Sequence, residues 1–214
     1  MPARKFKRAK IPVLRTEIHL FSGLGDGLFG IDRGVRELEK LIDDMPYVAD
    51  ARMWRYRQWE KVSDDIIQRH LTQPQRDDPI VIFIGHSKGA QAAVNAAQRL
   101  EAFGIETDLL VGIDPTALLP GEPPMKVPAS TREAMEFWSD RGLLNWPLRM
   151  RKKFPDGQFG GKFTYGSTPS PVRVVVPAGH IPVASHEVTR NRITARVRAI
   201  LRDAERETEK EKSQ

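Results

Sequence analysis

The most apolar stretch of the chain runs from Ile80 to Ile84 without a polar break, and a glycine-flanked serine follows it. A run of β-branched and aromatic residues of this length is typical of a strand buried on both faces of a parallel sheet. Beyond the serine, apolar residues recur at helical spacing: Ala90, Ala93, Val94, Ala97 and Leu100. The pattern therefore predicts a central strand, a sharp turn and an alanine-rich helix.

The same strand-then-helix pattern repeats along the chain. Further strands are predicted at Thr16–Phe21, Ala49–Tyr56, Asp108–Ile113 and Arg173–Val176. The second of these contains charged residues, so we place it near an edge of the sheet. Helices are predicted with Val35, Leu38, Leu41 and Ile42 facing inward, over Glu60–Leu71, and from His186 to about Arg206. This order predicts an α/β protein, three-layer αβα, with a mainly parallel central sheet of about five strands.

One segment, residues 115–171, departs from the alternation and is rich in proline, glycine and aromatic residues. We interpret it as an insertion over the carboxyl edge of the sheet, with a helix near Ser130–Ser139, because structureless loops of that length are rare in compact domains. Within it, Leu143–Lys153 combines apolar and basic residues and is a candidate lid. Residues 1–12 are expected to form a basic arm and residues 207–214 a charged tail. Without repeats or a linker, residues 1–214 are expected to form one domain.

The composition limits the classes of function that we expect for this protein. Of 214 residues, 40% are hydrophobic and 29% charged, as in globular proteins, and there is no cysteine for a disulfide or a thiolate metal site. The net charge of +6 comes largely from the first ten residues and from Arg149–Lys153, where no nucleic-acid motif occurs. We therefore expect no nucleic-acid partner and at most weak contact with anionic surfaces. No apolar run reaches the ~18 residues of a membrane span, and no signal peptide is evident, so a cytoplasmic location is expected.

The serine lies in Gly85-His86-Ser87-Lys88-Gly89, a G-x-S-x-G motif between the predicted strand and helix. In that context the motif is typical of a strained turn that presents the serine hydroxyl at the carboxyl edge of the sheet, at the positive end of a helix. Ser87 is therefore the candidate nucleophile. A purely structural tight turn is the alternative.

A nucleophilic serine needs an imidazole base, and the base needs an acceptor that holds its tautomer. Of the five histidines, His19 lies inside a strand, His70 ends a helix and His86 adjoins the serine, where neighbouring side chains point apart. This leaves His180, directly after the last strand, as the first candidate, with His186 as the alternate base. Asp114 follows the Asp108–Ile113 strand and is the candidate acid. The alternative is that its side chain hydrogen-bonds the backbone of its own turn before Pro115.

The developing oxyanion requires two preorganised N–H donors. The backbone N–H of Lys88 is one candidate. The second is that of Leu24 in the glycine-rich loop after the first strand, with Gly23 as the alternate. No metal or cofactor is required by this chemistry.

With these residues identified, the chain resembles the α/β-hydrolase superfamily, particularly small bacterial lipase-like and esterase-like members. The segment from Ile18 to Asp26 is similar to the oxyanion-loop strand, Gly85–Gly89 to the nucleophile elbow, and Leu110–Pro115 to a strand that carries the acid in some lipases. Val127 and Pro128, with Ala134, Phe137 and Ser139, resemble the segment between acid and histidine. The resemblance implies a minimal hydrolase core without the first antiparallel strands. It also implies a serine hydrolase that cleaves a small-molecule or lipid-like carboxylic ester or thioester through a Ser-Asp-His set and an acyl-enzyme.

Two other classes stay open. Gly25, Gly27 and Gly30 form a G-x-G-x-x-G sequence, which would suit an NADP-dependent oxidoreductase. However, its first glycine comes four residues after Phe21, late for a tight strand-to-helix turn. A catalytically silent hydrolase fold that acts as a binding module is the other alternative, because a fold does not guarantee an activity.

Overall fold

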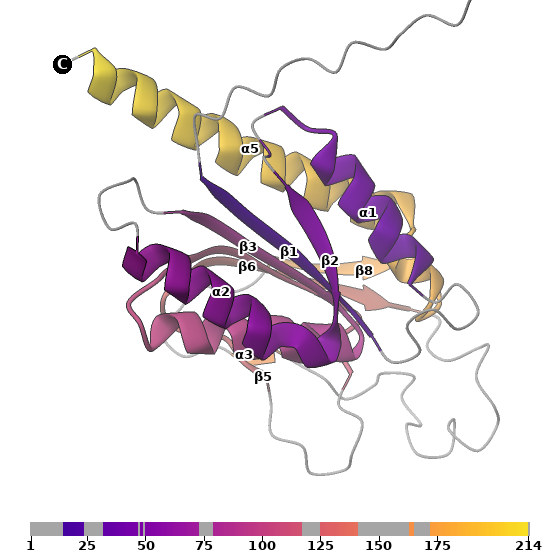
Figure 1. Cartoon of the computed structure of the whole chain (residues 1–214). Helices are drawn as coiled ribbons and strands as arrows, with labels where there is room; N and C mark the ends of the chain where they lie inside the picture. The colour runs from indigo at the N-terminus through magenta and orange to yellow at the C-terminus, as the bar shows by residue number, and fades with distance from the viewer. Residues whose placement is uncertain are drawn as a thin grey trace, which may run out of the picture.

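A computed structural model gives the fold of the protein (Figure 1). It describes residues 15–23, 32–46, 48, 50–72, 79–116, 125–140, 163–164 and 172–213. The predicted basic arm, most of the 115–171 segment including Leu143–Lys153, Leu24 and the Gly25–Gly30 glycines lie outside the described residues.

A parallel sheet forms the centre of the molecule. In the described part of the chain it has six strands: β1 (Thr16–Ser22), β2 (Ala51–Arg55), β3 (Ile80–His86), β4 (Thr107–Ile113), β6 (Thr131–Ser139) and β8 (Val172–Val176). They are arranged in the order β2-β1-β3-β4-β6-β8, and every neighbouring pair is parallel. The two short strands β5 (Met125–Lys126) and β7 (Phe163–Thr164) pair with each other in a separate sheet. The predicted parallel α/β sheet is confirmed, with one strand more than expected and with Ala51–Arg55 at an edge.

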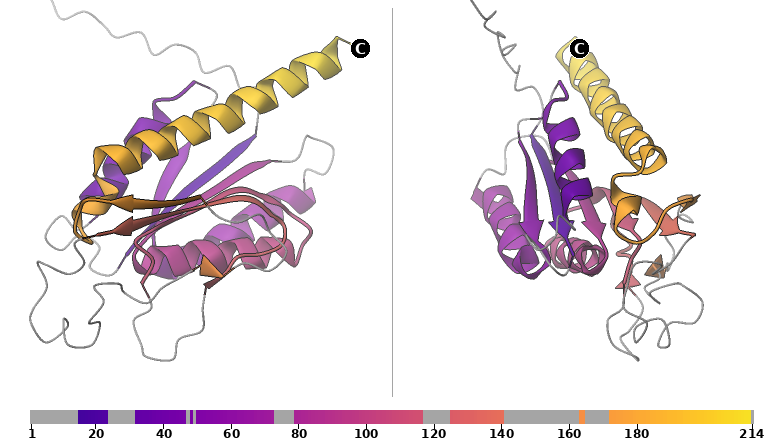
Figure 2. Two further views of the ribbon diagram at one scale, coloured as in Figure 1. Left: turned by 180° about the vertical axis from the view of Figure 1, so that it is seen from behind. Right: turned by 90° about the vertical axis from the view of Figure 1, so that its right-hand side faces the viewer.

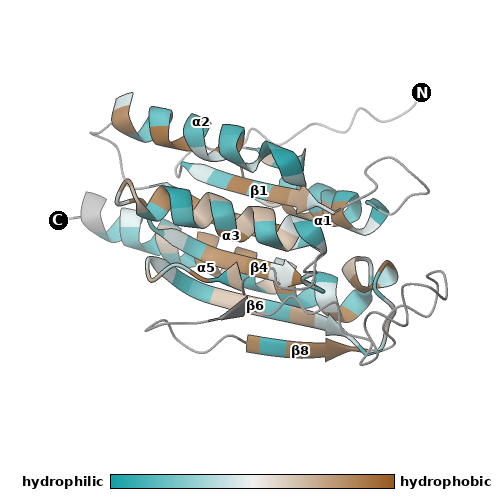
Figure 3. Ribbon diagram, turned by 90° about the horizontal axis from the view of Figure 1, so that it is seen from below, coloured by the Kyte–Doolittle hydropathy of each residue, from teal (hydrophilic) through white to brown (hydrophobic). Residues whose placement is uncertain are grey.

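Among the described residues, four α-helices cover the two faces of this sheet. They are α1 (Arg33–Asp43), α2 (Trp59–Thr72), α3 (Lys88–Glu101) and α5 (Glu187–Lys212), with short 3₁₀ turns η1 (Tyr56–Gln58) and η2 (Pro182–Ala184). Helices α1 and α5 lie on one face, and α2 and α3 on the other (Figure 2). This is the predicted three-layer αβα arrangement. In Figure 3, hydrophobic colour is concentrated along the strands, while α2 and α3 carry mixed hydrophilic and hydrophobic residues.

The central strand β3 shows why the apolar run is continuous. Ile80, Ile82 and Ile84 belong to the core beneath α1 and α5, whereas Val81 and Phe83 belong to the core beneath α2 and α3. Side chains alternate between the two faces of a strand, so a strand covered on both sides requires apolar residues at every position. The hydrophobic pattern around Ile80–Ile84 was therefore sufficient to predict its environment.

The expected helix near Ser130–Ser139 is wrong, because these residues form β6, between β4 and β8. Glutamates favour helices, and this segment has two. Here pairing with β4 and β8 overrides that preference, and both carboxylates have partners: Arg196 binds Glu133, and Arg173 binds Glu136 at 2.8 Å. Tertiary pairing thus decided the structure of the segment.

Two helix details also differ from the prediction. Leu41 is 45% exposed, and Gly34 lies on the buried face of α1 in its place. A side chain at Gly34 would overlap Ala184 and Ser185, so α1 approaches η2 closely there. Helix α5 continues to Lys212, which places most of the predicted charged tail within the helix.

The strand order reverses at β1, whose neighbours β2 and β3 are reached through helices on opposite faces of the sheet. Such a reversal opens a crevice at the carboxyl ends of the two central strands, where parallel α/β proteins bind ligands. β1 ends at Ser22, which Gly23 follows, and β3 ends at His86, which Ser87 follows. The topology therefore brings the predicted serine to the carboxyl edge of the sheet, beside the point where the strand order reverses.

Candidate active site

Ser87 occupies a strained turn between β3 and α3. Its φ is 57° and its ψ is −122°, a conformation that residues with a side chain rarely adopt. Its N–H donates to the carbonyl of Ile113 at 2.9 Å, which ties the turn to the end of β4. The sharp turn predicted from the motif is therefore present, with Ser87 7% exposed at the start of α3.

The flanking glycines explain how the turn closes. A Cβ at Gly85 would lie 2.2 Å from the carbonyl oxygen of Gly89, and one at Gly89 would lie 2.1 Å from that of Phe21. Any larger residue would push α3 away from β3 and β1. The two glycines are thus required for the close approach of helix and sheet that positions Ser87.

Gly23 lies directly against the serine from the end of β1. A Cβ added there would be 2.9 Å from the Cβ of Ser87 and 3.3 Å from its Oγ. The main chain of Gly23 therefore borders the space beside the hydroxyl, as an oxyanion donor must. Lys88, the other candidate donor, is the first residue of α3, at the positive end of the helix dipole.

Asp114 follows β4 in a second positive-φ conformation, with φ at 42°. Its Oδ2 lies 2.6 Å from Nδ1 of His180 and accepts a 2.8 Å hydrogen bond from the hydroxyl of Ser139, while Oδ1 accepts the N–H of Ser139 at 3.2 Å. Its own N–H donates to Phe137 at 2.7 Å. Donors from the end of β6 and from the loop after β8 thus fix the carboxylate.

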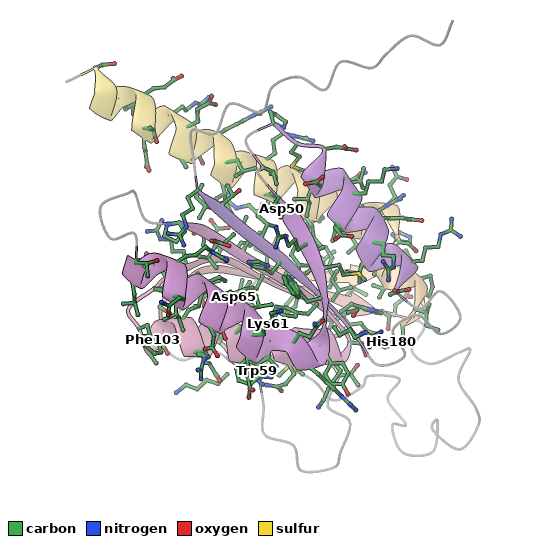
Figure 4. All side chains as sticks on the ribbon, in the orientation of Figure 1. Asp50, Trp59, Lys61, Asp65, Phe103 and His180 are labelled. Atoms are coloured by element: carbon green, nitrogen blue, oxygen red, sulfur yellow. The ribbon has the colours of Figure 1, made fainter. Side chains whose placement is uncertain are left out.

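His180 lies in the loop after β8 and is 5% exposed. Figure 4 shows it at the carboxyl end of the strands, at the opposite end of the molecule from Phe103. Because Nδ1 donates to Asp114, the remaining ring nitrogen, Nε2, is the one suited to accept a proton. The structure thus places the two sequence-predicted residues His180 and Asp114 in direct contact.

His186, the alternate base, has a different position. It caps the N-terminus of α5, where its Nδ1 accepts the N–H of Val188 at 3.3 Å. A histidine that accepts a hydrogen bond from its own helix in this way stabilises the end of that helix. No contact of His186 with Ser87 or Asp114 is present among the described residues.

Two polar residues of the site, Thr116 and Ser139, were given no role in the site from the sequence alone. The Ser87 hydroxyl donates to Thr116 Oγ1 at 3.3 Å, and the N–H of Thr116 donates to the carbonyl of Ser87 at 3.3 Å. Thr116 follows Asp114 by two residues, a spacing that could have indicated it. Ser139 could not be placed, because its segment was expected to be a helix.

His19 is buried and His70 lies at a helix end, as expected from their positions, and His86 is buried as well. His19 accepts a hydrogen bond from Trp54 Nε1 at 3.0 Å, and His70 lies in the last turn of α2. His86 is 1% exposed; burial, with the neighbouring His180, lowers its pKa to about 4. His86 is therefore a neutral imidazole near neutral pH.

The described residues hold no cluster of three or more histidines and carboxylates that could bind a metal ion. Within the same part of the chain, none of the helices combines the length and the apolar character that crossing a bilayer requires.

Comparisons with known proteins concern the fold. No protein-family model matches the sequence. No curated protein matches it either. A solved structure from Xanthomonas campestris pv. campestris, named "putative hydrolase of the alpha/beta superfamily", superposes with a TM-score of 0.52 at 13% identity, covering 85% of this chain and 98% of its own.

Two further solved structures give lower scores. Human thioesterase 2 matches with a TM-score of 0.49 at 12% identity, over 86% of this chain and 96% of its own. An esterase from Pyrobaculum calidifontis matches with a TM-score of 0.48 at 14% identity, over 89% and 77%. Together with the strand order, the parallel pairing and the serine turn, the Xanthomonas match shows that this chain has the α/β-hydrolase fold.

Proposed function

We propose that the protein is a serine hydrolase that cleaves a carboxylic ester or thioester through Ser87, His180 and Asp114. The observation that carries the proposal is the 2.6 Å contact between His180 Nδ1 and Asp114 Oδ2 at the sheet edge that presents Ser87 in its strained turn. Serine, histidine and aspartate come from the ends of three different strands. Sites are recognised by this geometry and these roles rather than by sequence position.

The proposed reaction begins with attack by Ser87 Oγ on the substrate carbonyl carbon. His180 Nε2 takes the hydroxyl proton, and the ionised Asp114 stabilises the imidazolium that forms. The hydroxyl that now donates to Thr116 turns toward His180, since a hydroxyl rotates freely about its C–O bond. The tetrahedral oxyanion receives N–H donors from Lys88 and from Gly23 or Leu24.

Collapse of the tetrahedral intermediate breaks the bond to the alcohol or thiol, which leaves with the proton from His180. Water then attacks the acyl carbon while His180 takes its proton. The bond between the acyl carbon and Ser87 Oγ breaks, His180 returns the proton to Oγ, and the carboxylic acid leaves. Proton uptake and release balance over the cycle. No cofactor enters these steps.

The substrate is proposed to be a small-molecule or lipid-like ester. The Xanthomonas protein of the same fold is named as a hydrolase, which is consistent with this class. In the proposal, Leu143–Lys153 acts as a lid on the acyl chain, and its basic residues favour anionic surfaces. Deletion of Leu143–Lys153 should reduce activity on long-chain esters more than on short-chain esters. An equal loss on both would contradict a lid.

The central experiment is labelling with a fluorophosphonate probe, followed by mass mapping of the modified peptide. Wild type should be labelled at Ser87, and Ser87→Ala should not be labelled. His180→Ala should lose labelling, whereas His186→Ala, the matched control, should keep it. A panel of esters and thioesters would then identify the preferred leaving group.

A folded wild type that is neither labelled nor active on the panel would overturn the proposal. That outcome would instead support a hydrolase fold used as a binding module. Loss of labelling in His186→Ala with retention in His180→Ala would exchange the roles of the two histidines.

A further inference from the structure

A second imidazole, that of His86, packs against His180, and the proposed reaction does not use it. His86 is the last residue of β3 and precedes Ser87. Its Nε2 lies 2.9 Å from the carbonyl oxygen of His180, and the two rings stack with centroids 5.0 Å apart and planes inclined by 30°. Because a carbonyl oxygen only accepts, Nε2 must carry the hydrogen of the neutral ring. His86 therefore contacts both the main chain and the ring of His180.

Core packing alone does not explain a histidine at this position. The Nδ1 atom of His86 is buried and has no hydrogen-bond partner among the described residues. A buried acceptor without a partner is destabilising, and phenylalanine would fill a similar space without that penalty. The hydrogen bond and the ring contact of His86 both go to His180.

The charge state of His86 suits this neighbour. During the proposed reaction His180 becomes an imidazolium, and a second positive ring stacked at 5.0 Å would repel it. Burial keeps His86 neutral in the range where a serine hydrolase works, since its pKa is about 4. The neutral ring supports His180 without opposing its protonation.

We propose that His86 is a positioning residue for the catalytic base. Its Nε2–H anchors the main chain of His180, and its ring face sets the plane of the His180 imidazole, so that Nδ1 meets Asp114 and Nε2 is directed to Ser87. The inference rests on the proposed function.

The test uses three substitutions that separate the hydrogen bond from the stacked ring. His86→Phe keeps a ring but loses the donor, His86→Gln keeps a donor near the same place but loses the ring, and His86→Ala loses both. We expect kcat on a short-chain ester to fall roughly tenfold in His86→Phe, as for one lost hydrogen bond, with KM unchanged. His86→Gln should recover part of that loss, and His86→Ala should lose the most.

One additional measurement and a control variant distinguish positioning from stability. Proton NMR should show the far-downfield signal of the hydrogen between His180 and Asp114 in wild type, and that signal should broaden or shift in His86→Phe and His86→Ala. His19→Phe is the matched control: His19 is a buried strand histidine beside Phe83, 6% exposed and bonded to Trp54. It should change thermal stability but neither kcat nor the NMR signal.

Unchanged kcat and unchanged NMR signal in a folded His86→Phe variant would overturn the inference. So would a loss of kcat that only follows loss of thermal stability and is equal in His19→Phe. If wild type shows neither labelling nor turnover, the proposed function fails, but the NMR signal still reports whether His86 holds His180.

Discussion

Two buried carboxylates at opposite ends of the sheet show how similar burial can serve different purposes. The side chains of Glu17, near the start of β1, and Asp114, after β4, are 9% and 10% exposed. Glu17 binds Arg69 of α2 through two hydrogen bonds of 2.9 and 2.8 Å. Asp114 binds the titratable imidazole of His180 and the neutral hydroxyl of Ser139.

The partners determine what each carboxylate can do. Arginine is permanently charged and its planar fork matches a carboxylate, so the Glu17 pair is fixed in charge and geometry. Burial alone would raise the pKa of Glu17, but hydrogen bonds and charge from His19 and Arg69 outweigh it and bring the pKa to about 2. Glu17 also lies 3.3 Å from Nε2 of His19, but Arg69 keeps a permanent positive charge beside it. The charged partner of Asp114, in contrast, is the imidazole of His180, which can gain and lose a proton. One end of the sheet is therefore suited to stability and the other to proton transfer.

The largest expected effect comes from Asp114→Asn. An amide at this position favours the wrong tautomer of His180, so kcat on a short-chain ester should fall by roughly 10⁴-fold. Thermal unfolding should change little by comparison. Glu17→Gln is the matched carboxylate-to-amide control, and its kcat should stay at the wild-type value. Equal losses of kcat in both variants would remove the functional distinction between the two ends.

The pH dependence of the free energy of unfolding should show the contribution of Glu17. Its pKa is 4.5 when unfolded and about 2 when folded, so below pH 4.5 the unfolded chain binds the proton first. Stability from this group is complete above pH 4.5 and is lost as the pH falls through 2, by roughly 3 kcal/mol in total. Urea unfolding of wild type and Glu17→Gln at several pH values would measure this. Parallel curves for the two proteins between pH 4.5 and 2 would contradict the assignment.

His86 should act in a different pH window. Its pKa is 6.5 when unfolded and about 4 when folded, so as the pH falls from 6.5 to 4 the unfolded chain binds the proton and stability decreases. The total effect is at most about 3 kcal/mol. His86→Phe should flatten the stability curve in this window and leave the Glu17 window intact. The same urea series would show both changes separately.

Ser139→Ala removes one of the hydrogen bonds that hold Asp114, and its effect on kcat should be smaller than that of Asp114→Asn. The variant removes the 2.8 Å hydroxyl hydrogen bond but keeps the N–H of residue 139, so kcat should fall roughly tenfold. Ser63→Ala is a suitable control, because Ser63 is also a buried serine but its hydroxyl donates to carbonyls within its own helix, α2. No change in kcat of Ser139→Ala would show that its hydroxyl does not orient the carboxylate.

The smallest expected effect is that of Arg69→Lys. Lysine keeps the charge but cannot bind Glu17 through a planar fork, so the free energy of unfolding should fall by about 1 kcal/mol. Enzyme activity should not change. A loss of activity without loss of stability would show that the Glu17 network is coupled to the site.

Much of the fold was predictable because local pattern and tertiary environment agree. The continuous apolar run of β3 reflects helices on both faces, and the charged residues of β2 reflect an edge position. The elbow was predictable from five consecutive residues because the G-x-S-x-G pattern marks the turn, although the steric limit at Gly89 is set by Phe21 of β1, far away in the chain. Thr131–Ser139 was not predictable in this way, because its propensity and its environment disagree.

The amino-acid sequence by itself determined the alternating order of strands and helices, the strained serine turn and the placement of Asp114 and His180 after strands. These depend on side-chain periodicity and on the steric freedom of glycine, which act over a few residues. Only the tertiary structure decided that His180 meets Asp114 while His186 caps its helix, that Ser139 and Thr116 join the site, and that His86 stacks on His180. These contacts join strand ends that are far apart in the chain, and their geometry depends on strand order and register rather than on any local preference.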